Sequence, residues 1–581
     1  MKVHVLALDF DGTIAIDGVL DDSVRDAVRT ARARGITVLL VTGRIRADLE
    51  RLLCDLALFD AVVAENGACV FFPQSGRSVA LGRSPPLAFT QELCRRDIPF
   101  LAGECVVDLH ADHASAVLSV IRILELPLVL QFNRDRLMVL PQAISKATGL
   151  REALRALRLS PHNAIAFGDA ENDYELLRAC ELGIAVAWGS DALTAAADEV
   201  LPGDGPPAVA RRILEIADDP RFAQNHQGRR LVHLGIREGG GSLTLPVRGR
   251  NVLVTGDTRS GKSWVTGLLC EQLVLEHYCV CIVDPEGEYA GMETLPSVVV
   301  FDADPVPPGL DDVERTLRYP DVSAVLDLSH LDHKEKTSYA KTLLKRLRGL
   351  RARTGLPHRI VVDEAHYFLH DPDVTELFDW SLSGYTLVTY RASQLHGAVL
   401  DAMQSIIVTR ASDPAEAEAL RGRFGRETDP QDWTEILPNL ETDEAALLPG
   451  SAESGDRLVR FKVSRRLTEH VRHERKYVSV PLPPQSSFVF MRDGTATGDR
   501  ACSLGEFVAI LEEEPTFGDH IRDHDVSRWV RDVFVDGVLA DRIREIEDEW
   551  IGGRIDAVHE AIAGAVRMRY HEAAGELPAA S

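Results

Sequence analysis

A glycine-rich stretch in the middle of the chain has residue types that can bind a polyphosphate. Residues 251–263 read Asn-Val-Leu-Val-Thr-Gly-Asp-Thr-Arg-Ser-Gly-Lys-Ser, which contains the spacing G-x-x-x-x-G-K-S. Gly256 and Gly261 let backbone N–H groups turn toward phosphates. Lys262 can reach the outer phosphates, and the Ser263 hydroxyl can ligate Mg²⁺. Because an apolar run precedes this stretch and a helical pattern follows it, we expect a phosphate loop that binds ATP and Mg²⁺.

A second apolar run ends in two adjacent carboxylates. Ile360-Val-Val is followed by Asp363 and Glu364. Asp363 would hold the water shell of Mg²⁺, and Glu364 would activate the attacking water. A kinase with the same phosphate loop does not need this glutamate, so the pair indicates ATP hydrolysis. It therefore disfavours the alternative that the chain joins a phosphatase to a kinase and repairs the ends of nucleic acids.

Two aspartates follow the first apolar run of the chain. Residues 3–8 predict a strand, and Asp9-Phe-Asp11-Gly-Thr follows it. In a parallel sheet these carboxylates lie at the carboxyl edge, where the sites of such sheets are found. Two negative charges at such a short separation repel each other unless a cation lies between them, so we expect Mg²⁺ here as well. Taken alone, the motif is also compatible with a loop cap.

Further polar groups stand at the ends of predicted elements. The strand over residues 36–41 ends before Thr42, Lys146 begins a helix, and the strand over residues 164–167 leads to Asp169 and Asp173. This ordered set resembles the haloacid dehalogenase (HAD) superfamily of phosphatases, in particular its Cof-like branch. The resemblance covers nearly all of residues 1–218.

The resemblance implies a phosphate ester as substrate and a role for each residue. Asp9 would be the nucleophile that forms an aspartyl-phosphate, and Asp11 would be the general acid and base. Thr42 would hydrogen-bond the phosphoryl group, and Lys146 would neutralise negative charge. The alternative is an inactive scaffold domain, which the presence of both Asp9 and Lys146 disfavours. The metal ligands would be Asp9, Asp11 through its backbone carbonyl, Asp169 and Asp173.

An insert at about residues 83–140 separates the second motif from the third. Its pattern predicts strands and a helix, and in the family this position holds a cap that closes over the substrate. The insert is short for this branch. We therefore hypothesise a small α+β cap that leaves the site open to bulky substrates.

The central segment carries a second resemblance. Asp284-Pro-Glu-Gly-Glu-Tyr289 and the run through Asp363-Glu364-Ala-His366 resemble the HerA and FtsK class of hexameric ATPases, HerA more closely. The family implies a homo-oligomer, a hexameric ring, with ATP between subunits and an arginine supplied by the neighbouring subunit. Arg391 and Arg410 are both candidates for that arginine.

One position departs from the family pattern. The strand after Glu364 usually ends in a glutamine, and here Tyr390 stands in its place. Thr389 or Gln394 are the substitutes that the sequence offers. The departure leaves open how ATP hydrolysis is sensed.

Composition sets limits on the class of protein. The chain has 581 residues with 64 Lys and Arg against 89 Asp and Glu, and its net charge is −25. This charge disfavours a broadly basic nucleic-acid-binding surface. The nine cysteines form no C-x-x-C pair. Together with the absence of a long apolar run and of a signal sequence, this predicts a cytoplasmic protein without a membrane partner.

The elements that must position these residues predict an α/β protein. We expect a HAD Rossmann-like domain with its small cap over residues 1–218, a linker over 219–230, a RecA-like ATPase domain over 231–480, and a small mostly helical domain over 481–581.

Two functional hypotheses follow. Residues 334–359 hold nine Lys or Arg and one acid, and a basic helix face could line a DNA channel. The first hypothesis is a phosphatase on an ATPase ring that acts on nucleic acid or nucleotides, in DNA processing or defence against invading DNA. In the second, the ATPase is a nucleotide-gated scaffold that arranges small-molecule phosphatases and does not translocate DNA. A solvated helix face remains an equal interpretation of the basic segment.

Overall fold

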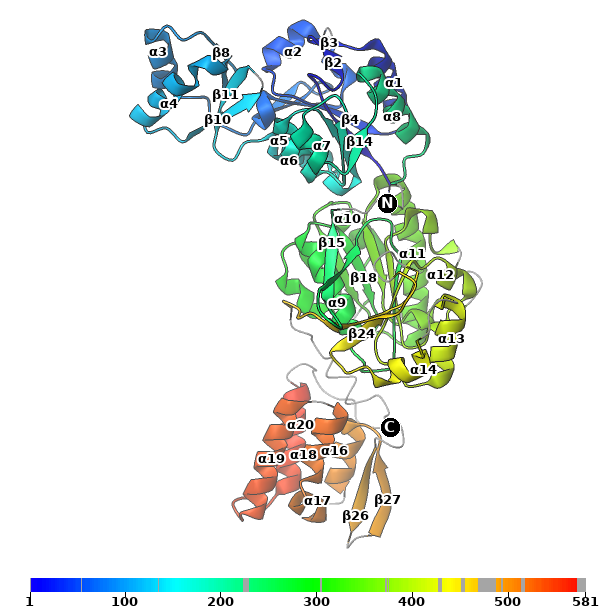
Figure 1. Cartoon of the computed structure of the whole chain (residues 1–581). Helices are drawn as coiled ribbons and strands as arrows, with labels where there is room; N and C mark the ends of the chain where they lie inside the picture. The colour runs from blue at the N-terminus through cyan, green and yellow to red at the C-terminus, as the bar shows by residue number, and fades with distance from the viewer. Residues whose placement is uncertain are drawn as a thin grey trace. The chain divides into compact units, whose positions relative to one another are not determined.

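The polypeptide forms two compact units. The computed structural model describes residues 2–53, 55–133, 135–222, 229–302, 306–370, 374, 376–426, 431–450, 455–468, 487–492, 495–513, 518–534 and 536–571. Residues 1–285 and 289–469 make the first unit, and residues 286–288 and 470–581 make the second (Figure 1). The domain boundaries at 218, 230 and 480 stay predictions. Among the described helices, none has the length and apolar character needed to cross a bilayer.

An eight-stranded sheet, in the order β14-β13-β12-β1-β4-β5-β6-β7, forms the core of the first segment. Its central strands are parallel and buried on both faces, as their unbroken runs of Val, Leu and Ala require. The strands are β1 (Val5–Asp9), β2 (Ala15–Ile16), β3 (Val19–Leu20), β4 (Thr37–Val41), β5 (Ala61–Ala64), β6 (Cys69–Phe72), β7 (Arg77–Ala80), β12 (Ala164–Gly168), β13 (Leu182–Val186) and β14 (Glu199–Leu201), of which β2 and β3 pair separately. The helices are α1 (Asp22–Ala33), α2 (Arg46–Leu52), α5 (Lys146–Leu157), α6 (Tyr174–Ala179), α7 (Asp191–Ala196) and α8 (Pro206–Asp218).

The predicted insert is a small α+β cap. Its four antiparallel strands run in the order β10-β11-β9-β8, and two helices pack on them. The elements are α3 (Leu87–Arg95), β8 (Phe100–Ala102), β9 (Val107–His110), α4 (Ala114–Ile123), β10 (Leu128–Asn133) and β11 (Arg136–Pro141).

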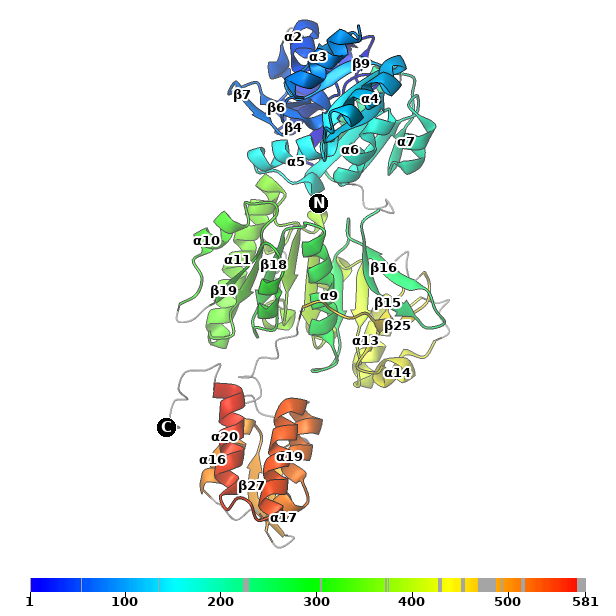
Figure 2. The same ribbon diagram turned by 90° about the vertical axis from the view of Figure 1, so that its left-hand side faces the viewer.

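An eleven-stranded sheet follows, in the order β16-β15-β25-β24-β23-β17-β22-β21-β18-β20-β19. Figure 2 shows the β15–β16 hairpin at one end of this sheet and β19 at the other. The strands are β15 (Leu231–Arg237), β16 (Ser242–Pro246), β17 (Val252–Thr255), β18 (Val280–Asp284), β19 (Val298–Asp302), β20 (Ser323–Asp327), β21 (Arg359–Val362), β22 (Tyr385–Thr389), β23 (Ser405–Val408), β24 (Glu444–Leu447) and β25 (Val459–Val463). The helices are α9 (Lys262–Leu275), α10 (Leu310–Thr316), α11 (His333–Thr354), α12 (Gly397–Asp401), α13 (Pro414–Phe424) and α14 (Trp433–Ile436).

The second unit is mostly helical and has its own apolar core. Its elements are β26 (Phe488–Arg492), β27 (Thr495–Ala501), α16 (Leu504–Glu513), α17 (Gly518–Arg522), α18 (Asp525–Trp529), α19 (Gly537–Ile551) and α20 (Val558–His571). His520 bonds Asp525 and His524 bonds Glu547, so both histidines serve the packing of this unit. The predicted α/β fold, with its cap, ATPase sheet and helical C-terminal segment, is thereby confirmed.

The two large sheets meet at the amino ends of their strands. Asn163 and Glu181 precede β12 and β13 of the first sheet, while Tyr278 and His358 precede β18 and β21 of the second. The Tyr278 hydroxyl donates to Glu181 Oε2 at 2.8 Å, and His358 Nε2 donates to Asn163 Oδ1 at 3.1 Å. These side chains are almost fully buried, so the contact is a sealed polar junction within one continuous core.

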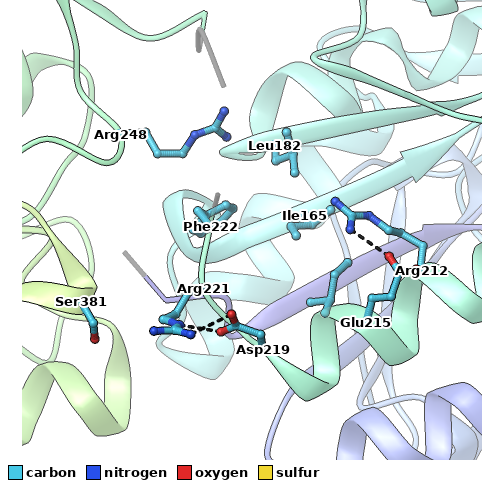
Figure 3. A pocket seen from close by; sticks show the side chains of 10 residues that line it. Ile165, Leu182, Arg212, Glu215, Asp219, Arg221, Phe222, Arg248 and Ser381 are labelled. Atoms are coloured by element: carbon cyan, nitrogen blue, oxygen red, sulfur yellow. Dashed lines mark hydrogen bonds and ion pairs between the residues drawn. The ribbon is translucent and has the colours of Figure 1, made fainter. Parts of the chain in front are cut away.

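A cavity of about 460 Å³ lies beside this junction. Figure 3 shows Arg248 entering it from one side and Ile165 and Leu182 from the other. The Arg248 guanidinium lies 5.7 Å from the centre of the Phe222 ring and donates to the Glu181 carbonyl at 3.2 Å. The junction therefore combines apolar packing with buried hydrogen bonds, each of which needs its partner.

We expect Tyr278→Phe to destabilise the first unit. The substitution removes the hydroxyl that donates to the buried Glu181 carboxylate at 2.8 Å, while the contact with His162 remains, and we expect a cost of about 1.5–3 kcal/mol in unfolding free energy. Urea denaturation followed by intrinsic fluorescence measures this change. Tyr319→Phe is the matched control, because Tyr319 is 42% exposed. Equal unfolding free energies for the two variants would contradict a structural role for the junction.

Candidate active sites

The first candidate site lies at the carboxyl edge of the eight-stranded sheet. Adjacent parallel strands β1, β4 and β12 end at or just before Asp9, Thr42 and Asp169. Lys146 begins α5, whose first turn is fixed by a capping box at Ser145. Non-local strand pairing thus brings together residues that lie more than a hundred positions apart.

Lys146 connects two of the aspartates. Its Nζ donates to Asp9 Oδ1 and to Asp173 Oδ1, each at 2.6 Å. Asp173 Oδ2 also accepts from the Asp169 backbone N–H at 3.1 Å. Carboxylate oxygens of Asp9, Asp169 and Asp173 lie within 4.8 Å of one another. The predicted nucleophile, lysine and acidic pair therefore form one buried cluster.

Burial raises the pKa of Asp9 well above its usual range, and the nearby Asp173 carboxylate adds to this effect. Burial alone would lower the pKa of Lys146, but Asp173 and Asp9 raise it above its usual value. Three carboxylates and one ammonium leave two negative charges when all are ionised. Clustered carboxylate oxygens are ligands that Mg²⁺ accepts, so this donor set fits a divalent cation.

Asp11 lies apart from that cluster and pairs with Arg44. The guanidinium donates to the two carboxylate oxygens at 2.6 and 2.7 Å, and this hydrogen bonding raises the pKa of Arg44. Such a bidentate pair fixes the orientation of the Asp11 carboxylate. The sequence analysis assigned no role to Arg44. Its position directly after Thr42-Gly43 is the sequence feature that indicates a place in the site.

A cavity of about 650 Å³ opens onto these residues and reaches the cap. Arg136 of the cap pairs with Asp108, and Trp188 Nε1 donates to the Gly12 carbonyl at 2.7 Å. Glu65 holds the cap connection, since its carboxylate accepts the backbone N–H groups of Glu104 and Cys105 at 2.8 Å. The acidic lining residues are Asp9, Asp11, Asp17, Asp48, Asp108, Asp135, Asp169 and Asp204.

The second candidate site is the phosphate loop between β17 and α9. Gly256 has φ 148°, and a Cβ there would lie 2.2 Å from Thr409 Oγ1. Gly261, with φ 98°, directly precedes Lys262 and Ser263 at the start of α9. Only glycine takes these conformations without strain. Lys262 Nζ donates to the Asp257 carbonyl at 2.9 Å, within the loop itself.

The predicted hydrolytic pair follows β21. Asp363 is buried, and its Oδ1 accepts the Glu364 backbone N–H at 2.8 Å. Glu364 itself has the left-handed conformation, with φ 44°. Since β22 alone separates β21 from β17, the pair and the phosphate loop belong to the same sheet edge. Carboxylates at this edge, next to a phosphate loop, suit the binding of a metal-bound triphosphate.

The structure distinguishes between the proposed substitutes for the missing glutamine. Gln394 is exposed in a short helix over Ala392–Gln394. Thr389 is buried at the end of β22, with its Oγ1 at 3.4 Å from His366 Nδ1. Thr389 is thus the one of the two that faces the site.

The basic segment is α11, and several of its cationic side chains contact other groups of the same chain. Arg346 pairs with Asp311 and Glu314, and Lys345 lies 3.7 Å from Glu376. Arg351 is buried against the Tyr385 ring and donates to the Ser383 carbonyl at 2.7 Å. These contacts favour a structural role for the helix.

Known proteins similar to this chain match about a third of its length. The chloroplastic endoribonuclease YBEY of Arabidopsis thaliana is 25% identical over 273 residues, which are 37% of this chain and 47% of that protein, so the chain spans about half of its length. A phosphoglycolate phosphatase of Methanosarcina acetivorans is 26% identical over 228 residues, covering 35% of this chain and 94% of that protein. A solved haloacid dehalogenase-like hydrolase from Bacteroides thetaiotaomicron is 18% identical, with a TM-score of 0.33, covering 36% of this chain and all of that one.

We expect Asp9→Asn to stabilise the metal-free protein at neutral pH. Because the folded-state pKa of Asp9 is raised, the metal-free protein loses stability as pH rises from about 4 toward that pKa. The amide oxygen still accepts from Lys146 but carries no charge. The melting temperature at pH 7.5 should rise by about 2–4 °C, and its further increase with Mg²⁺ should shrink.

Differential scanning calorimetry with and without Mg²⁺ measures both effects. Asp191→Asn, at an exposed position in the first turn of α7, is the control. A lower melting temperature for metal-free Asp9→Asn, or an unchanged response to Mg²⁺, would exclude the proposed charge balance.

Family models identify the two segments. The model of haloacid dehalogenase-like hydrolases matches residues 6–81 and 117–213, which carry the first site. The model of the helicase HerA central domain matches residues 247–375, which carry the phosphate loop and the hydrolytic pair. The chain therefore contains a segment that matches haloacid dehalogenase-like hydrolases, followed by a segment that matches the central domain of the helicase HerA.

Proposed function

We propose that the protein is a Mg²⁺-dependent phosphomonoesterase joined rigidly to an ATP hydrolase. The observation that supports it best is the buried cluster in which Lys146 bridges Asp9 and Asp173 at 2.6 Å, with Asp169 close by. A cluster of this kind is costly to bury and has a direct use in phosphoryl transfer. The bound Mg²⁺ would offset charge on the phosphoryl group.

The residues of the first site support an aspartyl-phosphate mechanism. A carboxylate oxygen of Asp9 attacks phosphorus, and the bond from phosphorus to the ester oxygen breaks. Asp11, in its protonated form, gives a proton to the leaving oxygen. Asp11 then takes a proton from water, whose oxygen attacks phosphorus and releases Asp9 and inorganic phosphate. Lys146 keeps Asp9 oriented, and Thr42 binds the phosphoryl oxygens.

The cavity walls favour a particular substrate. The cations that line it, Arg44, Arg136 and Lys146, are all paired with carboxylates, and acidic side chains dominate the lining. A second negative charge on the substrate would face repulsion, whereas hydroxyl groups would find acceptors. We therefore propose a small phosphate monoester whose other part is uncharged and hydroxyl-bearing.

Purified full-length protein assayed against a phosphate-ester panel tests this proposal. Hexose phosphates should exceed phosphoglycolate, nucleotides and phosphorylated DNA ends in kcat/KM by at least about tenfold, the effect of roughly 1.4 kcal/mol. Asp9→Asn should abolish the activity and Asp191→Asn should not. A preference for DNA ends would favour the nucleic-acid hypothesis.

We propose that the second site hydrolyses ATP in a homo-oligomeric ring, for which a hexamer is the family expectation. Arg391 suits the arginine that reaches a neighbouring subunit, since its side chain is 46% exposed and lies 3.3 Å from Asp413. Arg410 lies beside its own phosphate loop, where its carbonyl accepts from Asp257. The paired cations of α11 favour the nucleotide-gated scaffold over a DNA translocase.

Glu364→Gln should lower kcat for ATP hydrolysis by at least about 100-fold and leave binding of a fluorescent ATP analogue intact, since the amide cannot take the proton of water. Glu376→Gln, at a side chain 70% exposed, is the control. Hydrolysis that survives Glu364→Gln would exclude this site. Sedimentation analysis measures whether the protein forms an oligomer of the size of a ring. DNA binding across a salt series distinguishes a DNA translocase, which should bind DNA at low salt, from a nucleotide-gated scaffold, which should not.

A further inference from the structure

His366 lies directly beside the proposed catalytic base. Its Nδ1 is 3.4 Å from Glu364 Oε2, and the two side chains are only 12% and 17% exposed. Nδ1 is also 3.4 Å from Thr389 Oγ1. Because catalytic hydrogen bonds are commonly long before substrate binds, these distances allow contacts that tighten around ATP.

Two tyrosines hold the His366 ring in place. The Tyr367 ring centre lies 4.5 Å away at an interplanar angle of 64°, and that of Tyr390 lies 4.4 Å away at 88°. Edge-to-face contacts at these separations are favourable. The imidazole therefore has little freedom to turn away from Glu364.

The backbone around Glu364 explains why such support is needed. Glu364 has φ 44°, outside any regular strand or helix, and it lies two residues after the end of β21. His366 stands two residues later in the short turn Ala365–Tyr367. A non-glycine residue keeps such a conformation only where the surrounding structure fixes it.

The contacts of His366 extend to β22, the strand that pairs with β17 before the phosphate loop. Thr389 ends β22 and pairs in register with Thr255, the last residue of β17.

Burial, together with the nearby Lys262, lowers the pKa of His366 to about 4, which leaves the ring neutral near pH 7. A neutral ring with its proton on Nδ1 can donate to Glu364 and leave the carboxylate able to accept the proton of water.

We propose that His366 is a positioning residue for ATP hydrolysis, which orients Glu364 and is itself held by Tyr390 and Thr389. This cluster fills the place of the glutamine that the HerA pattern has at position 390. The proposal rests on the assignment of Glu364 as the base. Glu364 takes the proton, and His366 keeps its own throughout.

Substitutions of His366 in the full-length protein test the proposal. His366→Ala should lower kcat for ATP by about 10–100-fold, the usual effect of losing a supporting hydrogen bond, and leave binding of a fluorescent ATP analogue within about twofold. His366→Asn places an N–H donor near the position of Nδ1 and should restore most of kcat. Tyr390→Leu removes the ring that packs on His366 and should lower kcat as His366→Ala does, whereas Tyr390→Phe keeps the ring and should lower kcat less.

The controls separate this proposal from the assignment of the base. His370→Ala removes a neighbouring imidazole whose Nδ1 lies 3.2 Å from the His366 carbonyl, and should leave kcat unchanged. Adding His366→Ala to Glu364→Gln should cause no further loss. If Glu364→Gln is inactive but His366→Asn is no better than His366→Ala, or analogue binding falls with kcat, His366 is structural and the proposal is wrong. If Glu364→Gln stays active, the base itself is misassigned.

Discussion

Parallel strands place their carboxyl ends at one edge of a sheet, and both candidate sites of this protein depend on that constraint. Asp9 and Asp169 end neighbouring strands of the first sheet, while Asp284 and Asp363 end or follow strands of the second. The opposite edges are then available for assembly. They carry Asn163, Glu181, Tyr278 and His358, which join the two sheets in the buried junction. One rule of sheet geometry therefore separates the reacting groups from the groups that hold the domains together.

The two sites differ in how they handle charge. In the first, carboxylates are buried and Lys146 offsets part of their charge, so the site is arranged to receive a cation. In the second, Lys262 bonds a carbonyl of its own loop, which keeps the ammonium beside the place of the phosphates. Burial raises the cost of an unmatched charge in both. Each site is thus most stable with its ligand bound.

Much of this arrangement follows from local sequence patterns. The strand ends at Asp9 and Asp363, the glycines of the phosphate loop and the capped start of α5 at Lys146 combine short apolar runs with turn residues, and the structure has them where the patterns predict. The pairing of Arg44 with Asp11 and the packing of Tyr390 on His366 depend on contacts between separate elements. The junction depends on which loops meet, and no periodicity encodes that. The basic face of α11 shows the same limit, because its acidic partners Asp311, Glu314 and Glu376 come from other segments.

The buried junction between the two sheets has a consequence for the movement of products between the two candidate sites. Since it lies at the amino ends of β12, β13, β18 and β21, the reacting edges of the two sheets point away from each other through the first unit. Within one chain, the buried junction therefore lies between the two sites, and a product released at one of them is not delivered directly to the other. The strands that run from the junction to each site are the direct structural connection between the two sites.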